Sequence, residues 1–192
     1  MPQTVNEIFA GRDVICYTEP WAAGNTFPAN NAWGTAPGGS WVDQGWTKDG
    51  VAVRWRQQIQ TYMVDQSLDP VTALPLSRDL RFVASIGQID MPALVVSTSA
   101  GSATGTLAPG SGTADYILQS VAQNLYYSVF FDVRNPLTND FAHFVGWFTR
   151  GVGDQEIRVH LPDLAQINIE MQAFPDTSTS PARVAQFRIQ MG

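Results

Sequence analysis

The stretch Ala36–Val53, APGGSWVDQGWTKDGVAV, joins loop residues, two tryptophans and a turn signal directly to a strand. Pro37 fixes its own φ, and the glycines of this stretch permit positive φ angles that other residues avoid. The pair Asp49-Gly50 is typical of a turn. From Val51 onward apolar and polar side chains alternate with the period of two that a half-buried strand requires. The stretch predicts a shaped structural surface rather than a reactive centre.

The strand that follows is predicted to run from Val51 to Val64. Asp65 and the pair Asp69-Pro70 interrupt it, because proline cannot donate to a strand ladder and biases the residue before it away from helix. A loop then extends to about Ser77. One face of the strand carries Val51, Val53, Trp55, Ile59, Thr61 and Met63, and the other carries Arg54, Arg56, Gln58, Gln60 and Tyr62.

The rest of the chain reads as short strands separated by turns and by a loop of small residues at Ser97–Thr113. Gly87–Ser97 is the one predicted helix, and a short buried strand is the competing interpretation. Short strands at this spacing are typical of an antiparallel β-sandwich or barrel. The fold class is therefore mainly β, with one short helix and an extended N-terminal arm and loops. Strands are expected at Leu80–Ser85, Tyr116–Val121, Leu125–Val133, Phe141–Thr149, Glu156–Leu161, Gln166–Phe174 and Arg183–Gln190.

Residues 1–50 lack sustained periodicity but hold four of the six tryptophans. A disordered tail would be poor in aromatic residues. We therefore expect residues 1–50 to form an extended arm packed on the domain or on a neighbour, and residues 51–192 to form a single β-sandwich domain. The equally weighted alternative is that these tryptophans complete the core of their own domain. They are Trp21, Trp33, Trp41 and Trp46.

Composition restricts the class of function. The 192 residues suit one domain, and 11 basic against 17 acidic residues give a net charge of −6. The absence of any run of Lys or Arg disfavours tight nucleic-acid binding. Cys16 is the single cysteine, which excludes an internal disulfide and disfavours a cysteine zinc site. The chain also lacks a signal-peptide pattern and a long apolar run, so we expect a soluble protein of a reducing cytoplasm.

No residue set predicts catalysis. His143 and His160 lie in expected strands, and no acid stands near either of them at metal-ligand spacing. Asp65 and Asp69 would suit a glycosidase pair, although aspartates start turns routinely. No serine stands in a nucleophile elbow, and the glycines of residues 101–112 lack the lysine and the strand-to-helix context of a phosphate loop. We expect no enzyme, cofactor or metal.

The opening stretch resembles the major tail tube protein of long-tailed, non-contractile bacteriophages, over roughly residues 35–96. In that family a proline and glycine segment leads to a tryptophan, then to a glycine and aromatic pair, and then to an aspartate-glycine turn before the first long strand. The matching residues are Ala36-Pro37, Trp41, Gly45-Trp46-Thr47 and Asp49-Gly50-Val51.

The resemblance implies a virion subunit that forms a ring, usually hexameric, whose rings stack into a tail tube assembled in the bacterial host cytoplasm. Its partners would be other copies of itself and other tail proteins, with no membrane. Genome DNA would pass through without specific binding, because an acidic or neutral wall does not hold phosphates. Suspected subunit contacts are Trp21, Trp33, Trp41, Trp46, Gln58, Gln60, Tyr62, Asp65 and Asp69.

Three alternatives stay open. A tail terminator or head decoration subunit would form closed rings or trimers without stacking. A carbohydrate-binding β-sandwich would expose Trp33, Trp41 or Trp46 for stacking on sugars. A small hydrolase that uses Asp65 and His143 ranks last.

Overall fold

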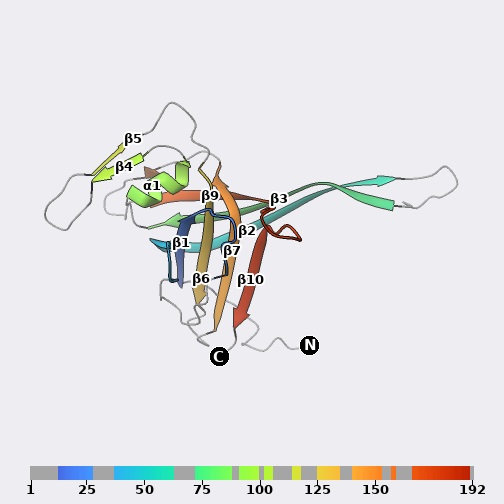
Figure 1. The fold of residues 1–192 in the computed structure, drawn as a ribbon, viewed down its shortest axis with the longest axis horizontal. Coiled ribbons are helices and arrows are strands. Elements are labelled where there is room, and N and C mark those ends of the chain that lie inside the picture. Colours follow the sequence, from blue (N-terminus) through green and yellow to red (C-terminus); the bar gives the residue numbers. More distant parts are fainter. Residues whose placement is uncertain are drawn as a thin grey trace.

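The computed structural model describes ten segments of the chain, on which all structural statements below rest. Figure 1 shows a barrel of strands from which a long two-stranded arm projects, with a short helix and a small separate sheet on the opposite side. The described residues are 13–27, 37–62, 72–87, 91–99, 102–105, 114–117, 125–134, 140–152, 157–158 and 166–190.

Six antiparallel strands close the barrel in the order β7-β6-β1-β2-β3-β9, and pairing of β9 with β7 completes the ring. The predicted mainly β, antiparallel class is confirmed, and its form is a barrel. β7 has two neighbours on one side, since Phe141–Gly146 pair with β10 and Phe148–Gly151 pair with β9. The strands are β1 Asp13–Pro20, β2 Val42–Tyr62, β3 Thr72–Ile86, β6 Tyr127–Arg134, β7 Phe141–Gly151, β8 Ile157–Arg158, β9 Gln166–Phe174 and β10 Ala185–Gln190.

β2 is longer than predicted, because the expected turn at Asp49-Gly50 lies inside it. Thr47 pairs with Ile86 and Val51 pairs with Ala84, so β2 holds extra residues between these two pairs. Gly50 has a φ of 81°, which glycine adopts as readily in a β-bulge as in a turn. The irregularity lets β2 leave β1 and continue alongside β3. The predicted turn at Asp49-Gly50 is therefore an irregularity inside β2, and the predicted strand start at Val51 was wrong.

The barrel interior holds one apolar cluster to which every barrel strand contributes. The rings of Phe82 on β3 and Phe131 on β6 stack with centroids 5.8 Å apart. Gly146 on β7 leaves room for the Phe82 ring, because a Cβ at this position would lie 2.7 Å from that ring. Fully buried members of the cluster include Cys16, Phe82, Ile86, Val129, Phe131 and Met171.

The helix α1, Met91–Thr98, confirms the predicted helix, with Pro92 in its first turn. Ala93, Leu94 and Val96 are buried in the same core as the barrel residues. The expected loop at Ser97–Thr113 is corrected in part, because β4 at Ser102–Gly105 pairs with β5 at Ala114–Ile117. Small residues give a weak strand signal, so this pairing depends on the partner strand rather than on β4 itself.

The expected boundary at residue 50 does not separate an arm from the barrel. β1 lies between β6 and β2 in the sheet, and Val42–Trp46 of β2 pair with β1. Both segments are barrel strands, although they belong to the range expected to form the arm. The sequence concealed β1 because both of its faces are apolar and buried, which removes the alternation that marks a half-exposed strand. Residues 1–12 lie outside the described residues.

Candidate assembly surface

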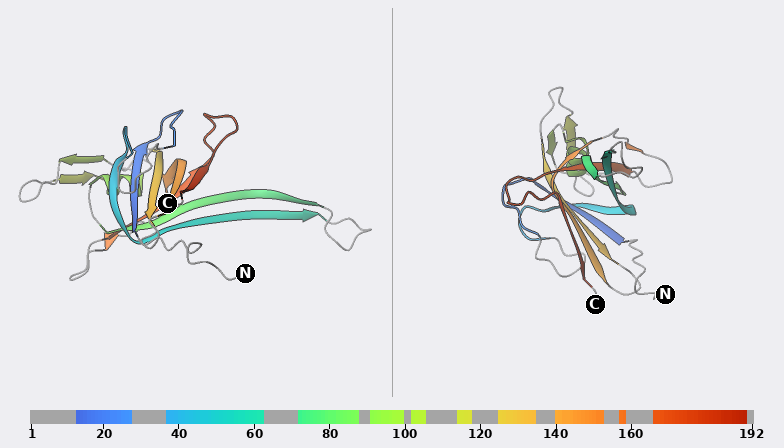
Figure 2. Two further views of the ribbon diagram at one scale, coloured as in Figure 1. Left: turned by 90° about the horizontal axis from the view of Figure 1, so that it is seen from below. Right: turned by 90° about the vertical axis from the view of Figure 1, so that its right-hand side faces the viewer.

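β2 and β3 continue beyond the barrel as a two-stranded arm, defined here as residues 56–62 and 72–79. The two strands pair along the whole arm, from Arg56 opposite Asp79 at its base to Tyr62 opposite Thr72 at its far end. Over these residues the described pairings give neither strand a second neighbour. Figure 2 shows the arm extending well past the other strands. An isolated hairpin is marginally stable in water, so the arm would gain stability from a partner.

The predicted contact residues Gln58, Gln60 and Tyr62 all lie on this arm and are exposed. Gln58 accepts a hydrogen bond from the Ser77 hydroxyl across the strand pair, at 3.3 Å. Large apolar side chains are exposed on the same arm, with Ile59 at 55% and Leu74 at 52%. The structure thus brings these three predicted residues together. Asp65 and Asp69 lie outside the described residues.

The predicted tryptophan contacts separate into two kinds. Trp21 packs on Phe148 of its own barrel, with ring centroids 4.8 Å apart, and Trp41 packs on Phe130 at 5.9 Å. Trp46 points outward from β2 and is 51% exposed. Trp21 and Trp41 therefore pack within the chain, whereas about half of the Trp46 surface is exposed. Trp33 lies outside the described residues.

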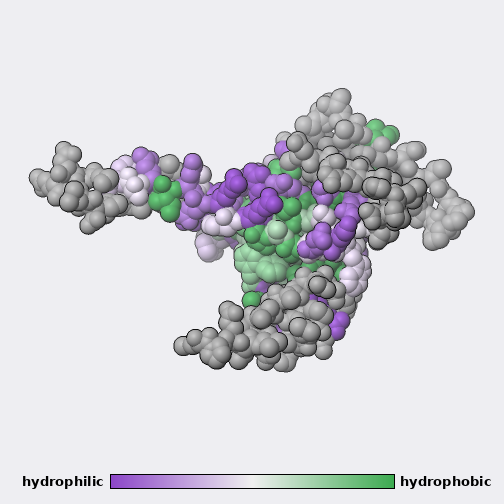
Figure 3. Space-filling view, turned by 180° about the vertical axis from the view of Figure 1, so that it is seen from behind, coloured by the Kyte–Doolittle hydropathy of each residue, from purple (hydrophilic) through white to green (hydrophobic). Residues whose placement is uncertain are grey.

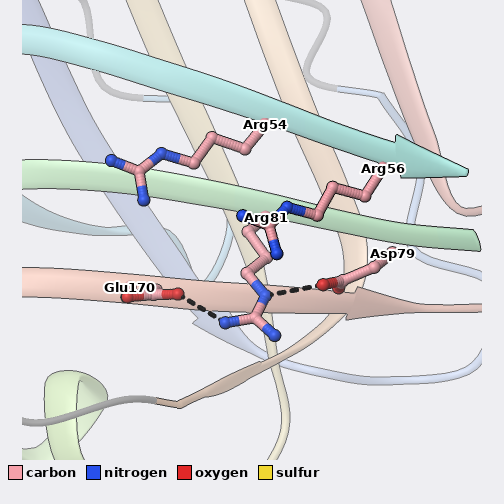
Figure 4. A pocket seen from close by; sticks show the side chains of 5 residues that line it. All are labelled: Arg54, Arg56, Asp79, Arg81 and Glu170. Carbon is pink, nitrogen blue, oxygen red and sulfur yellow. Dashed lines mark hydrogen bonds and ion pairs between the residues drawn. The ribbon is translucent and has the colours of Figure 1, made fainter.

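The outer face at the base of the arm carries a cluster of charged side chains, shown in Figure 4. Nε of Arg81 lies 2.8 Å from Oδ2 of Asp79, and its Nη1 lies 2.8 Å from Oε1 of Glu170. The pKa of Arg81 is raised above its usual value, mainly by the hydrogen bond to Glu170 and next by the hydrogen bond to Asp79. Arg54 and Arg56 border the same depression and are exposed. Neither makes an ion pair with another residue in the described part of the chain.

The inner face at the base of the arm is apolar. Trp55 on β2 and Phe187 on β10 are 53% and 51% exposed. Phe187 also contacts Phe144, with ring centroids 5.3 Å apart. Figure 3 shows hydrophobic surface beside the base of the arm, next to the hydrophilic arm itself. A shallow groove here is lined by Val53, Trp55, Leu80, Val184, Ala185 and Phe187.

The most buried titratable pair lies elsewhere, on the outer face of β6 and β7. His143 is 1% exposed and Asp132 is 0% exposed, and Nε2 of His143 lies 3.2 Å from Oδ1 of Asp132. The His143 ring packs between Phe130, at 5.1 Å, and Phe27, at 6.2 Å. His143 lies on β7, as the expected strand Phe141–Thr149 placed it, and its ring is packed within the chain. His160 lies outside the described residues.

Cys16 is fully buried among core residues. Burial raises the pKa of its thiol far above the usual value, which keeps the thiol protonated. In the described segments no three His, Cys, Asp or Glu side chains are placed to hold a metal ion. Within those segments, too, no helix has the length and apolar character needed to cross a membrane.

Sequence reasoning placed Arg54 and Arg56 on the polar face of the strand without identifying them as a site. The available signal was their spacing of two residues, which puts both guanidinium groups on one face. The apolar groove gave no such signal, because Trp55 and Phe187 are separated by more than half of the chain and meet only in the folded barrel.

Comparison with models of protein families finds no family that matches this chain. A search of curated proteins likewise finds no relative.

Proposed function

We propose that this protein is a structural subunit that assembles with copies of itself, and specifically a tail tube subunit of a long-tailed bacteriophage virion. The observation that carries the proposal is the arm. It projects from a closed barrel, has open backbone edges on both strands in the described region, and exposes Ile59, Tyr62 and Leu74. Open strand edges and exposed apolar side chains are hazards unless another chain covers them.

In a closed ring of copies, each arm would be covered by a neighbouring copy. Each arm has the same neighbour surface in a ring, so assembly ends without leaving an open sheet edge. Rings of this protein, usually hexameric in the family that the sequence resembles, would then stack into a tube for genome DNA. The net charge of −6 supports the conduit role, because a wall poor in cations does not retain a sliding polyanion.

Negative-stain microscopy and sedimentation of the purified full chain test the proposal. We expect rings that stack into tubes as concentration rises. Closed rings or trimers without stacking would instead favour a tail terminator or head decoration subunit. A strictly monomeric species at high concentration, also after the addition of virion components, would contradict self-assembly.

An arm-deleted variant provides the matched control. Residues 58–77 are replaced by Asn-Gly, so that Gln57 and Arg78, which pair in β2 and β3, are joined by a tight hairpin turn. Among the deleted residues, those that the structure describes pair only with one another. We therefore expect a folded, soluble barrel that no longer assembles, and normal assembly of this variant would remove the arm from the proposal.

A carbohydrate-binding barrel is the second candidate, and the exposure of Trp46 favours it. Aromatic rings with one free face are suited to stacking on apolar faces of ligands. Titration of tryptophan fluorescence with a panel of glycans tests it, with Trp46→Ala as the control. A glycan-dependent shift that this substitution removes, in a protein that stays monomeric, would favour carbohydrate binding over assembly.

A further inference from the structure

The charged cluster at the base of the arm has an unbalanced composition. Arg54 on β2 stands directly opposite Arg81 on β3 in the strand register. Like charges placed directly opposite each other destabilise an antiparallel pair. In the isolated chain this arrangement therefore costs free energy.

The nearby carboxylates are already engaged. Both Asp79 and Glu170 accept hydrogen bonds from Arg81. The second oxygen of Asp79 accepts a further hydrogen bond from Nε2 of Gln172, at 3.1 Å. Arg56, which stands opposite Asp79 in the register, makes no ion pair with it at 4.0 Å or less. In Figure 4 the side chains of Arg54 and Arg56 lie beside the Arg81 network without joining it.

We propose that Arg54 and Arg56 form a carboxylate-binding surface for a second copy of this chain. The inference deepens the proposed self-assembly and rests on it. Guanidinium groups bind carboxylates through two parallel hydrogen bonds, and Arg54 and Arg56 present two of them on one strand face. Another copy supplies the carboxylates, because 17 acidic residues stand against 11 basic ones in each chain.

Charge balance favours a second copy over nucleic acid as the occupant. Phosphate backbones are held by several cations acting together. Here Arg81 is neutralised by its two carboxylates, which leaves two exposed guanidinium groups on an acidic protein. A second copy, which also has a net charge of −6, needs to place only one or two carboxylates against these two cations, whereas a polyanion needs several cations along its length.

Charge reversal tests the surface in the full-length protein. Arg54→Glu and Arg56→Glu are each compared with Lys48→Glu, which changes the net charge equally at another exposed position of β2. Sedimentation is expected to show a tenfold or greater rise in the concentration for half-assembly with either arginine variant, and little change with Lys48→Glu. Assembly of the unchanged protein is expected to weaken as NaCl rises from about 0.05 to 0.5 M, because salt screens the attraction between exposed opposite charges.

The outcomes separate this inference from the proposed function. Normal assembly of both arginine variants would overturn the carboxylate surface and leave self-assembly standing. Failure of the unchanged protein to assemble would overturn both. Binding of duplex DNA that depends on Arg54 and Arg56, with assembly unaffected, would identify a phosphate surface and also overturn the inference. Circular dichroism verifies folding, and Arg54→Gln with Arg56→Gln replaces the pair if a charge-reversed variant misfolds.

Zero-length cross-linking identifies the occupant. The variant with both Arg54→Lys and Arg56→Lys is treated with a carbodiimide. The reagent joins a lysine amine to a carboxylate in contact with it through an amide bond. The carbodiimide takes up the water that is lost and becomes a urea. Assemblies mixed from ¹⁴N- and ¹⁵N-labelled protein are expected to yield mixed-isotope peptides that contain residue 54 or 56. Links confined to one isotope would show a contact within the chain and contradict the proposal.

Discussion

The outer surface of the barrel has two faces, which differ in polarity and in whether other residues of the chain cover them. On β1, β6 and β7 the outer face is mostly apolar apart from the buried pair Asp132 and His143. The described part of the β1–β2 connection covers it with Phe27 and Trp41. On β2, β3 and β9 the outer face is polar and, among the described residues, uncovered, and it carries Arg54, Arg81 and Glu170. One face completes the fold of the single chain, whereas the described side chains of the other stay half-exposed or exposed.

Arginine side chains also pack on the covered face. Arg183 lies over the Trp147 ring at 3.7 Å, and its Nε donates to Oδ2 of Asp176 at 2.9 Å. Arg188 lies over the Phe27 ring at 3.8 Å. On the uncovered face Arg81 makes its ion pairs at the surface. Arginine and carboxylate pairs are thus more deeply buried on the covered face than on the uncovered one.

The largest effect is expected from Phe130→Ala on the covered face. Phe130 is fully buried against Tyr17, Trp41 and His143, and its removal leaves a cavity. We expect a loss of about 3–5 kcal/mol of unfolding free energy, measured by urea denaturation. Gln172→Ala on the uncovered face is the control, and an equal loss there would erase the contrast between the faces.

Asp176→Asn is expected to cost about 1–3 kcal/mol, because it removes the charge that partners a half-buried arginine. Burial alone would raise the pKa of Asp176, but hydrogen bonds from Ser178 and Arg183 outweigh it and hold the pKa below the usual 3.8. The native stability from this group is therefore present above pH 3.8 and is lost as pH falls through the lower folded pKa. Denaturation between pH 6 and the acid limit measures this, and the acid slope is expected to be smaller in the variant.

Phe27→Ala tests whether the cover itself matters. Phe27 is half-buried and contacts Phe130, His143 and Trp147. We expect a loss of about 1–2 kcal/mol, together with faster hydrogen exchange in β6 and β7. Ala23→Ser, at an exposed position of the same connection, should change neither quantity. Unchanged exchange in Phe27→Ala would mean that the cover contributes nothing to the protection of this face.

The smallest effect is expected from Arg54→Ala on the uncovered face. Its unfolding free energy should change by less than about 0.5 kcal/mol, with a slight gain from removing the like charge opposite Arg81. Thermal denaturation of the unassembled protein measures it. A loss comparable to that of Asp176→Asn would show that Arg54 stabilises the single chain rather than a contact between chains.

Several features could be read from the sequence because they depend on local patterns. Gln166–Phe174 alternates apolar and polar residues, and β9 has these bounds. The polar residues Gln58, Gln60 and Tyr62 were placed together on one strand and are exposed on the arm. The tail tube assignment and the virion location stay predictions.

Other features were beyond local patterns. Gly50 has the same preference for positive φ in a bulge as in a turn, and only the pairing of β2 with β3 decides between them. β1 was concealed for a similar reason. Val14 and Cys16 face the barrel core while Ile15 and Tyr17 face the covered outer surface, so the strand shows no alternation.

By itself, the sequence determined that this protein is an antiparallel β domain with one short helix and a long strand that has a polar face. Those properties follow from side-chain periodicity and backbone preference, which act over a few residues. Only the tertiary structure decided that the barrel closes, which outer face is covered, and that Arg54 faces Arg81. Such relations join residues far apart in the chain, and their free energies exist only once the strands are paired.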